Sequence, residues 1–367
     1  MKIFDYVKDF GHEQLVYFYD KDTGLKALTC IHSTVLGPSL GGTRFWNYAT
    51  EEEAVFDVLR LARGMTYKSA CAGLNLGGGK SVIIGDAKIL RQDMVKREAF
   101  FRAFGRFVEG LAGRYITAED SNTSPQDMDY INMETDYVVG LEHKSGNPSP
   151  FTALGVFRSI QACCEFEYGS KSTKGRTVMV QGAGGAVGSV LCKLLHEDGA
   201  KLVISGLDET KLKPIVENYN ATVVGKDDVY SQKCDIFAPC AFGGGINDKT
   251  IKQLKCKIVA PAANNVLLDI PRDGKLLHEK GIVYAPDYVA NSGGVINVFE
   301  ELNPAGYNRE KSVRQIDLIF DRTLEILKTS KETNTPSSAV ADKMAENRIE
   351  AVKNVHRTYL RKRDGKW

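Results

Sequence analysis

Two lysines in a glycine-rich stretch are the first residues of this chain that could do chemistry. Lys68 and Lys80 lie in the segment MTYKSACAGLNLGGGKSVIIGD, in which three glycines directly precede the second lysine. In a partly buried, glycine-lined cleft, mutual repulsion and the loss of hydration would both lower a lysine pKa toward neutrality, where the amine can act as a general base. The competing interpretation is that both are surface lysines, as most lysines are. The local sequence alone favours neither.

The same stretch ends like a phosphate-binding P-loop, because Gly79, Lys80 and Ser81 follow in that order. That motif requires a glycine five positions before Gly79, where Leu74 stands, and Gly73 is one position too early. A P-loop also leads into a helix, whereas a strand-like run follows Lys80. These two mismatches argue against nucleoside-triphosphate binding.

A pair of carboxylates follows another short strand-like run. In RYITAEDSNTSP the run ends at Glu119 and Asp120, where a side chain would point from the edge of a sheet into a cleft. The alternatives are an ordinary loop acid and an N-cap for the helix expected near Gln126. Taken alone, the pattern favours these alternatives.

A second glycine-rich stretch predicts a dinucleotide-binding turn. In VMVQGAGGAVGSVLCKLL, from Val178, a buried strand leads into glycines and then into a helix. Such a turn brings backbone N–H groups and a helix N-terminus against a pyrophosphate, and this context makes the pattern specific. The alternative is a tight turn without a ligand. The residues expected to bind the cofactor here are Gly182, Ala183, Gly184, Gly185, Ala186, Val187 and Gly188.

Two features depart from the usual dinucleotide fingerprint. The glycine spacing is G-x-G-x-x-x-G, and Gly206 ends the next strand, where an acidic residue normally binds the adenosine ribose. Asp208 follows two residues later, and the nearest cations are Lys211 and Lys213, with no arginine placed to bind a 2′-phosphate. We therefore predict NAD as the cofactor, with Asp208 reaching the ribose, and keep NADP as the alternative.

Small and polar residues follow the later apolar runs. Ala241 ends FAPCA, and Asn264 and Asn265 lie in APAANNVL. Both segments follow predicted strands, at the carboxyl edge where open α/β sheets bind ligands. Either asparagine could position a nicotinamide ribose or carboxamide. In YAPDYVANSGGVINV the glycine pair would let a helix N-terminus approach the substrate, whereas Asp287 is expected to be structural.

The elements that must position these residues follow from periodicity and turn signals. Strands are expected at residues 14–19, 25–32, 81–85 and 114–118, and helices at 51–63, 100–111 and 126–134. The turn-rich segment SGNPSP, residues 145–150, predicts a linker. Beyond it we expect strands at 177–181, 201–205, 234–239, 257–261 and 282–285, with helices at 186–196 and 209–219, the second interrupted by Pro214.

This regular alternation predicts a doubly wound, Rossmann-like parallel sheet. The fold class is therefore α/β, with two domains and a cleft between them. Residues 1–145 are expected to form a substrate-binding and catalytic domain onto which the C-terminal residues 332–367 pack back, and residues 146–331 the dinucleotide-binding domain.

Composition and charge exclude several classes of protein. The chain has 367 residues, and its 48 basic and 46 acidic residues leave a net charge of +2, so neither nucleic acid nor a membrane is an expected partner. No apolar run reaches the roughly 18 residues needed to span a bilayer, and the charged N-terminus is unlike a signal peptide, so a cytoplasmic location is expected. The eight cysteines include no C-x-x-C pair, which argues against a disulfide framework and against a metal site.

Taken together, these stretches resemble the Glu/Leu/Phe/Val amino-acid dehydrogenase family, and within it the leucine dehydrogenases most closely. The match is collinear from about residue 5 to about residue 360. The segments that carry it are LGPSLGGTRFW, GMTYKSACAGLNLGGGKSVIIGD, GRYITAED, SGNPSPFTALGV, DIFAPCA, ANN and YAPDYVANSGGVINV.

The resemblance implies oxidative deamination of an L-amino acid to a 2-oxo acid and ammonium, with a hydride passing to a nicotinamide cofactor. By position in the family motifs, Lys68 would bind the substrate carboxylate and Lys80 would be the base that activates water. Asp120 would bind the amino group and shuttle protons. Gly41, Gly42 and Met65 would line the substrate site, and Ala241 and Asn264 the cofactor side.

The resemblance also indicates the substrate. The side-chain pocket positions are Leu40, Ala118, Val295 and Val298, aliphatic residues of medium size that favour leucine, valine or isoleucine. One alternative is a dehydrogenase for aromatic or unusual amino acids in a biosynthetic pathway. Another is a non-catalytic relative that binds a ligand. The family further implies a homo-oligomer, for example an octamer.

Overall fold

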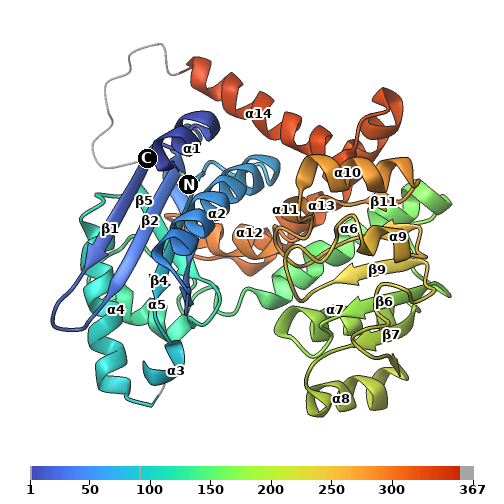
Figure 1. Cartoon of the computed structure of the whole chain (residues 1–367), viewed down its shortest axis with the longest axis horizontal. Helices are drawn as coiled ribbons and strands as arrows, with labels where there is room; N and C mark the ends of the chain where they lie inside the picture. The colour runs from blue at the N-terminus through green and yellow to red at the C-terminus, as the bar shows by residue number, and fades with distance from the viewer. Residues whose placement is uncertain (1, 91, 356–367) are drawn as a thin grey trace. The chain divides into compact units, whose positions relative to one another are not determined.

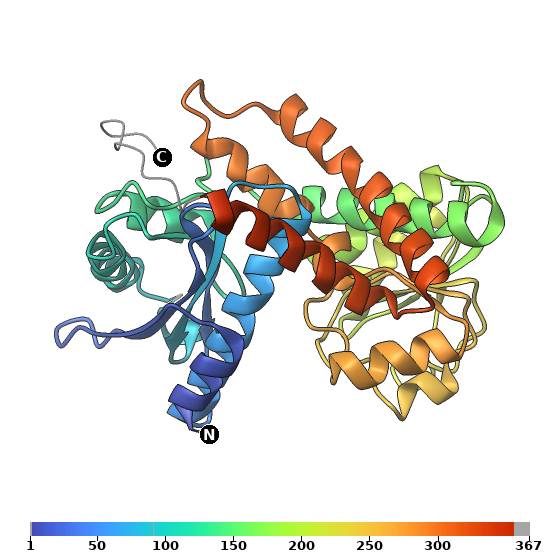
Figure 2. The same ribbon diagram turned by 90° about the horizontal axis from the view of Figure 1, so that it is seen from above.

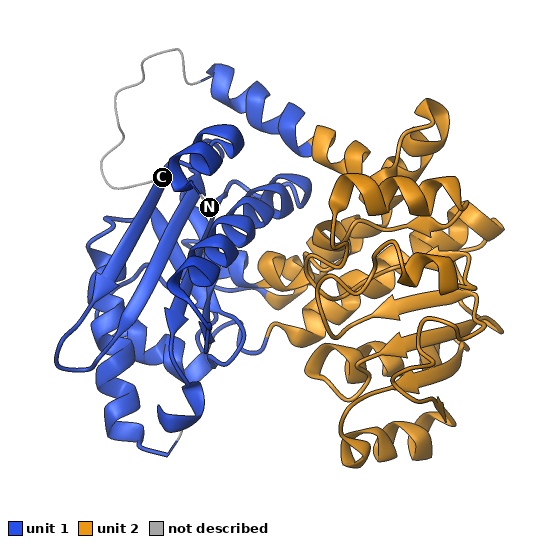
Figure 3. Ribbon diagram, in the orientation of Figure 1, with its two compact units in different colours: residues 1–147, 298–308, 345–367 blue, residues 148–297, 309–344 orange. Residues whose placement is uncertain are grey.

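The computed structural model describes residues 2–90 and 92–355. The chain divides into two compact units (Figure 3), unit 1 with residues 1–147, 298–308 and 345–367 and unit 2 with residues 148–297 and 309–344. No helix in the described ranges is long and apolar enough to cross a membrane.

This division differs from the predicted one in the C-terminal third. Residues 332–344, predicted to join the first domain, belong to unit 2, and residues 298–308 belong to unit 1. Hydrogen bonds give the reason: Ser337 Oγ donates to the Tyr284 carbonyl in unit 2, whereas Arg348 donates to the Ser69 and Ala70 carbonyls in unit 1. Residues 356–367 of the predicted returning segment lie outside the described residues.

Unit 1 is built on a mixed five-stranded sheet in the order β1-β2-β4-β3-β5. Strands β1, β2, β4 and β5 are labelled in Figure 1. Strands β3, β4 and β5 run parallel to one another, and β1–β2 and β2–β4 are antiparallel pairs. The strands are β1 (Gln14–Tyr19), β2 (Lys26–Ser33), β3 (Ser39–Trp46), β4 (Gly77–Ile84) and β5 (Tyr115–Glu119). The helices are α1 (Ile3–Phe10), α2 (Glu51–Cys71), α3 (Ala87–Leu90), α4 (Met94–Glu109) and α5 (Pro125–Asn132).

Strand β2 shows why this sheet has helices on both faces. Its side chains alternate, so that Ala27 and Ile31 pack with Phe101 of α4, while Leu28 and Cys30 pack with α2. A strand buried on both faces reads as a continuous apolar run. Helices α2 and α4 therefore enclose the sheet between them.

Sequence patterns did not predict β3, nor the glycine half of β4. Glycine weakens strands in general, but here it permits close packing. A Cβ on Gly41 would lie 1.8 Å from the Gly79 carbonyl oxygen, and one on Gly78 would lie 2.0 Å from the Thr66 nitrogen of α2. Lys80 therefore lies within β4, and the strand does not begin after it as predicted.

Unit 2 contains a six-stranded sheet in the order β11-β10-β9-β6-β7-β8, all parallel. This order is that of the doubly wound dinucleotide-binding fold, which confirms the predicted fold class. The strands are β6 (Thr177–Gln181), β7 (Lys201–Ser205), β8 (Thr222–Val223), β9 (Ile236–Pro239), β10 (Ile258–Val259) and β11 (Val283–Tyr284). The early helices are α6 (Ser149–Tyr168), α7 (Ala186–Glu197), α8 (Glu209–Tyr219), α9 (Thr250–Gln253) and α10 (Ile270–Glu279). The later helices are α11 (Asp287–Ala290), α12 (Gly293–Phe299), the 3-10 helix η1 (Glu300–Leu302), α13 (Arg309–Thr333) and α14 (Ser337–Val355). Of these, residues 298–302 and 345–355 are part of unit 1.

Two helical features differ from expectation. The predicted linker is short, because α6 starts at Ser149 with a proline in its first turn, and α13 packs along it (Figure 2). Helix α8 also continues through Pro214 without interruption. Pro214 is exposed, so water can satisfy the carbonyl that loses its helical partner.

Candidate active site

The parallel strands of unit 1 bring the predicted catalytic pair together, Lys80 from within β4 and Asp120 directly after β5. Lys80 Nζ lies 3.1 Å from Asp120 Oδ2, as an ion pair whose lysine side chain is only 6% exposed. The register explains this meeting, because β3 pairs with both neighbours, Thr43 with Ser81 of β4 and Gly42 with Ala118 of β5. Residues far apart in sequence thus meet across β3, the strand between β4 and β5.

Gly42 keeps the space beside this pair open. A Cβ at that position would lie 2.5 Å from the Glu119 carbonyl oxygen and 2.8 Å from Asp120 Cβ. A larger residue would therefore displace the loop that carries the carboxylate. Gly41, which packs closely against Gly79, also accepts a 2.6 Å hydrogen bond at its carbonyl from the buried Tyr115 hydroxyl.

The electrostatics divide the proton unequally between the two partners. Burial lowers the pKa of Lys80; Asp120 opposes this shift and the positive charge of Arg44 adds to it, leaving the lysine pKa below its ordinary value. Burial alone would raise the pKa of Asp120, but Lys80 and Arg44 hold it well below its usual range. The carboxylate thus stays ionised while the lysine is able to release its proton.

Sequence reasoning missed the second cation on this carboxylate. Arg44 Nε donates to Asp120 Oδ2 at 3.0 Å, and its Nη1 donates to Asp57 Oδ2 of α2 at 2.9 Å. Tyr48 also donates to that Asp57 oxygen, at 2.6 Å. The signal available in the sequence was an arginine directly after GGT in a strand that itself went unpredicted.

The loop after β5 fixes Asp120 and excludes the capping alternative. The Asp120 N–H donates to Thr123 Oγ1 at 2.9 Å, and that hydroxyl donates to the Thr43 carbonyl at 3.0 Å. Asn122 adopts a left-handed φ of 63° and donates from its amide to the Phe45 carbonyl. The N-cap of α5 is Ser124, in a capping box, and not either carboxylate predicted for that role.

The neighbouring Glu119 behaves in the opposite way to Asp120. Burial raises the pKa of Glu119 to about 7, with further contributions from the charges of Asp120 and Asp127. Its Oε2 is buried without a hydrogen-bond partner in the described structure. Two adjacent carboxyl groups therefore hold different protonation states near neutral pH.

Helix α2 carries Lys68 and Met65, two further residues that were predicted to contact the substrate. Lys68 is 9% exposed and Lys80 is 4% exposed. The alternative that both are surface lysines is therefore wrong. Thr66, whose backbone contacts Gly78 of β4, is also hydrogen-bonded to the buried His32 ring at 2.8 Å. Met65 is half-buried on the same helix.

The predicted side-chain pocket residues are all buried. Leu40 on β3, Ala118 on β5 and Val298 belong to unit 1, with exposures of 1%, 6% and 5%. Val295 belongs to unit 2 and is 8% exposed.

In unit 2 the glycine turn is shaped for close approach by a ligand. Gly182 has a φ of +76°, and a Cβ on Gly188 would lie 2.3 Å from the Gly182 carbonyl oxygen. Gly185 is the N-cap of α7 and has no side chain to accept from the first helical N–H groups, which leaves them available to a ligand. This is the geometry that accepts a pyrophosphate.

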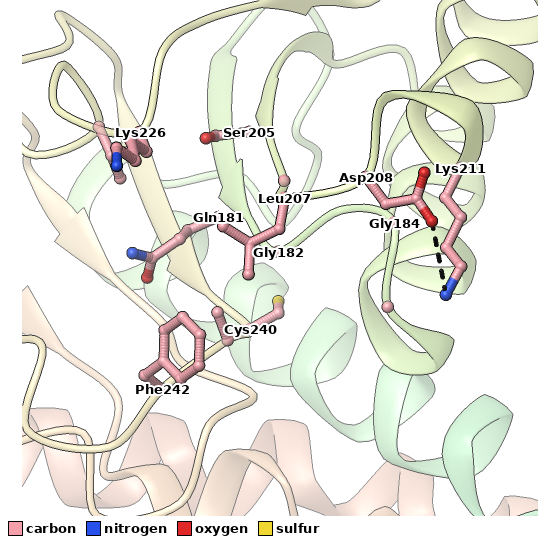
Figure 4. A pocket seen from close by; sticks show the side chains of 14 residues that line it. Gln181, Gly182, Gly184, Ser205, Leu207, Asp208, Lys211, Lys226, Cys240 and Phe242 are labelled. Carbon is pink, nitrogen blue, oxygen red and sulfur yellow. Dashed lines mark ion pairs between the residues drawn. The ribbon is translucent and has the colours of Figure 1, made fainter.

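A pocket of about 350 Å³ lies beside this turn (Figure 4). Its walls include Gly182, Gly184, Gly185, Asp208 and Ala241, all predicted to bind the cofactor. The other turn residues do not line it: Ala183 is fully buried and Gly188 packs against the turn backbone, while Ala186 and Val187 start α7. The size and shape fit part of a dinucleotide.

Asp208 stands at the end of this pocket and caps α8. Its Oδ1 accepts hydrogen bonds from the Thr210 N–H at 3.0 Å and the Thr210 hydroxyl at 2.6 Å. Hydrogen bonds from Thr210 lower the pKa of Asp208, and Lys211 lies 3.9 Å from its Oδ2. The pocket thus has an ionised carboxylate although Gly206 carries none.

Asn264 is oriented by a residue that the sequence analysis did not single out. The amide of Asn291 donates to Asn264 Oδ1 at 2.9 Å and to the Ala262 carbonyl at 3.0 Å. This hydrogen bond to its oxygen fixes the orientation of the Asn264 side chain, with the amide nitrogen pointing away from the Asn291 amide. Asp287, expected to be structural, accepts a hydrogen bond from the Val266 N–H at 3.1 Å.

A dinucleotide-binding sheet in one unit and a buried lysine–carboxylate pair in the other belong to dehydrogenases that combine hydride transfer with proton transfer. Comparisons with known proteins give the particular family. Residues 12–137 match the dimerisation domain of the Glu/Leu/Phe/Val dehydrogenases, and residues 147–361 match Glutamate/Leucine/Phenylalanine/Valine dehydrogenase. The chain belongs to this family and is an amino-acid dehydrogenase, an oxidoreductase that uses a nicotinamide cofactor.

Individual relatives cover almost the whole chain. Leucine dehydrogenase from Thermoactinomyces intermedius is 53% identical over 98% of this chain and 97% of its own length. Valine dehydrogenase from Streptomyces virginiae is 45% identical over 92% of this chain and 94% of its own length. The crystal structure of L-tryptophan dehydrogenase from Nostoc punctiforme has a TM-score of 0.79 and 43% identity, covering 95% of this chain and 99% of that one.

Proposed function

We propose that this enzyme oxidatively and reversibly deaminates a branched-chain L-amino acid, leucine, valine or isoleucine, to the 2-oxo acid and ammonium with NAD as cofactor. The observation that carries the chemistry is the ion pair between Lys80 of β4 and Asp120, 3.1 Å apart beside Gly42. Burial and the positive charge of Arg44 lower the pKa of Lys80, so the lysine can give up and regain a proton beside the ionised Asp120.

Each residue has one task in this proposal. Lys68, almost buried on α2, binds the substrate carboxylate. Asp120 uses Oδ2 for its two cations. Its Oδ1 accepts no hydrogen bond from residues 2–90 or 92–355 and faces the substrate amino group. A nicotinamide cofactor, held by the glycine turn of unit 2, would supply the acceptor for the hydride of the substrate Cα.

Lys80 then works on water. In its neutral form it takes a proton from the water that adds to the imino carbon of the substrate, which forms a carbinolamine. That proton passes by way of Asp120 to the nitrogen. As the C–N bond breaks, the hydroxyl gives its proton to the neutral Lys80, ammonia leaves and the 2-oxo acid forms. The acid and base tasks thus fall on Lys80 and Asp120. Both have a lowered pKa, but the ordinary pKa of a lysine is far above that of an aspartate.

The substrate class rests on the four aliphatic pocket positions and on the names of the leucine and valine dehydrogenase relatives. The relative that acts on L-tryptophan supports the alternative of an aromatic or unusual substrate. A methylene in such a pocket is worth about 1–3 kcal/mol, so the three branched-chain amino acids should all be accepted.

The choice of NAD rests on Asp208. An ionised carboxylate that lines the adenosine side of the pocket can accept hydrogen bonds from a ribose and repels a 2′-phosphate. Lys211, the nearest cation, is paired with this aspartate.

We further propose that the enzyme works in the cytoplasm as a homo-oligomer, for example an octamer. The match of residues 12–137 to a dimerisation domain supports oligomerisation. The eight cysteines form no disulfide among the described residues, which fits a reducing compartment.

The test is nicotinamide reduction with a panel of L-amino acids, using NAD and NADP separately. Activity on leucine, valine and isoleucine with NAD is expected. Activity with NADP alone, or on aromatic amino acids alone, would preserve the reaction but refute the cofactor or the pocket assignment. A folded protein that is silent across the panel yet binds a nicotinamide dinucleotide would support the non-catalytic alternative.

A further inference from the structure

Arg44 occupies a forked position between two carboxylates. Its Nε lies 3.0 Å from Asp120 Oδ2 and its Nη1 lies 2.9 Å from Asp57 Oδ2. Asp57 belongs to α2 and also accepts a hydrogen bond from Tyr48. The guanidinium is therefore tied at one end to a helix, and its other end meets the carboxylate that pairs with Lys80.

Both cations contact the same oxygen of Asp120. Without Arg44, Lys80 would be the only cation on that carboxylate, and loss of the lysine proton would leave a buried negative charge with no partner. Because an unpaired buried charge is costly, Lys80 would hold its proton more tightly and its pKa would be higher. With Arg44 present, the carboxylate keeps a permanent cation whatever the state of the lysine, since a guanidinium does not deprotonate.

We infer that Arg44, anchored by Asp57, is a positioning residue that holds Asp120 ionised and in place so that Lys80 can release its proton. The inference rests on the proposed function, because it assigns a task within the same site. Arg44 itself needs no contact with the substrate and acts through Asp120.

The other ionisable groups around Lys80 do not supply this effect. Glu119, adjacent in sequence to Asp120, holds its proton to about pH 7. The Tyr115 hydroxyl donates to a backbone carbonyl, and Lys68 on α2 adds a like charge on the covering helix. Asp57 pairs with Arg44 and accepts from Tyr48, and its negative charge raises the pKa of Lys80, the opposite of the effect of Arg44.

The experiment compares Arg44→Met, Arg44→Lys and the control Arg106→Met. The control removes the same group from α4, where the side chain is 76% exposed. For Arg44→Met we expect kcat to fall at least tenfold near pH 7 and the alkaline rise of kcat/KM to move up by about one pH unit, a tenfold change in the proton equilibrium. Arg44→Lys keeps the positive charge but cannot contact Asp57 and Asp120 through two separate nitrogens. Its kcat and pH profile should therefore lie between those of Arg44→Met and the wild type. Arg106→Met should match the wild type.

A second measurement separates this inference from the proposed function. Competitive acetylation of Lys80, followed by mass spectrometry of its peptide across pH, reports the lysine proton without any turnover. In folded Arg44→Met, checked by circular dichroism, the midpoint for Lys80 should move up by about one pH unit. An unchanged midpoint would overturn the role of Arg44, whether or not the wild type is active. An inactive wild type with a shifted midpoint would refute only the proposed reaction. If Arg44→Met does not fold, Arg44→Lys tests the same role through a smaller upward shift of the midpoint.

Discussion

The two units prepare their sites in different ways. In unit 1 the site is made of charged side chains that lock one another, Lys80, Arg44 and Asp57 around Asp120. In unit 2 the site is made largely of backbone, a glycine turn and a helix N-terminus that no side chain caps. The difference follows from the task, because moving protons requires tuned side chains, whereas holding a pyrophosphate requires N–H groups and space.

The comparison predicts different consequences of substitution. In unit 1 a change of charge should abolish chemistry and leave the cofactor bound. In unit 2 a change of shape should weaken the cofactor and leave the proton chemistry intact.

Lys80→Ala should have the largest effect. Turnover should fall by about a thousandfold or more, because no other described amine pairs with Asp120, while NADH affinity stays within about twofold. Steady-state kinetics and fluorescence titration of NADH measure the two quantities. Lys88→Ala, an exposed lysine on α3, is the matched control. Residual activity above a few per cent would mean that a different group is the base.

Gly188→Ala should have the next largest effect, and on the opposite function. The added Cβ meets the Gly182 carbonyl oxygen at 2.3 Å, so the turn must move. We expect NADH binding to weaken at least tenfold and stability to fall by about 1–3 kcal/mol. Gly64→Ala provides the control for stability, since nothing lies within 4 Å of its Cβ position and the helix favours alanine. Unchanged NADH affinity would refute the assignment of the turn.

Glu119→Gln should change stability in a pH-dependent manner. The pKa of Glu119 is raised to about 7, so the folded state binds its proton more tightly than the unfolded state. The wild type therefore loses stability as the pH rises from about 4.5 to about 7, by about 1–3 kcal/mol, and the variant does not. Tm measured at pH 4.5 and pH 8 should show the variant gaining several degrees at the higher pH only. The control Glu142→Gln, at an exposed position, should differ from the wild type in Tm by the same amount at pH 4.5 and pH 8. If the Tm difference of Glu119→Gln is also the same at both pH values, the raised pKa of Glu119 is contradicted.

Asp208→Ser should have the smallest effect. Serine can still cap α8, so stability is kept, but the charge that repels a 2′-phosphate is lost. The ratio of NADPH to NADH affinity should rise about tenfold, as measured by titration of both cofactors. Glu209→Ala, the next acidic residue and not part of the pocket wall, should leave the ratio unchanged. A preference for NADPH in the wild type would refute the role given to Asp208.

Sequence patterns predicted unit 2 better than unit 1, for a physical reason. A parallel sheet buried on both faces produces apolar runs separated by turns, and strands such as β6 and β7 are each followed by a turn that is visible in the sequence. The glycine turn is contiguous in sequence, so its pattern carries its function.

The site of unit 1 depends on register between distant segments. Nothing near Lys80 in the sequence indicates that Arg44 of β3 and Asp120 after β5 lie beside it. Strand β3 was not predicted because its glycines, which weaken strands in general, serve close packing. The family resemblance named Lys80 and Asp120, but Arg44 and Asn291 emerged only from their contacts. Interactions between side chains from separate elements leave no periodic signal.

The central claim is that buried Lys80 acts as a base with a lowered pKa beside an ionised Asp120. The pH dependence of kcat/KM for leucine oxidation with NAD, from about pH 6 to pH 11, tests it most directly. We expect a rise with the slope of one proton and a plateau reached below the ordinary lysine pKa of about 10.4. A profile that is flat between about pH 7 and pH 10 would contradict the claim.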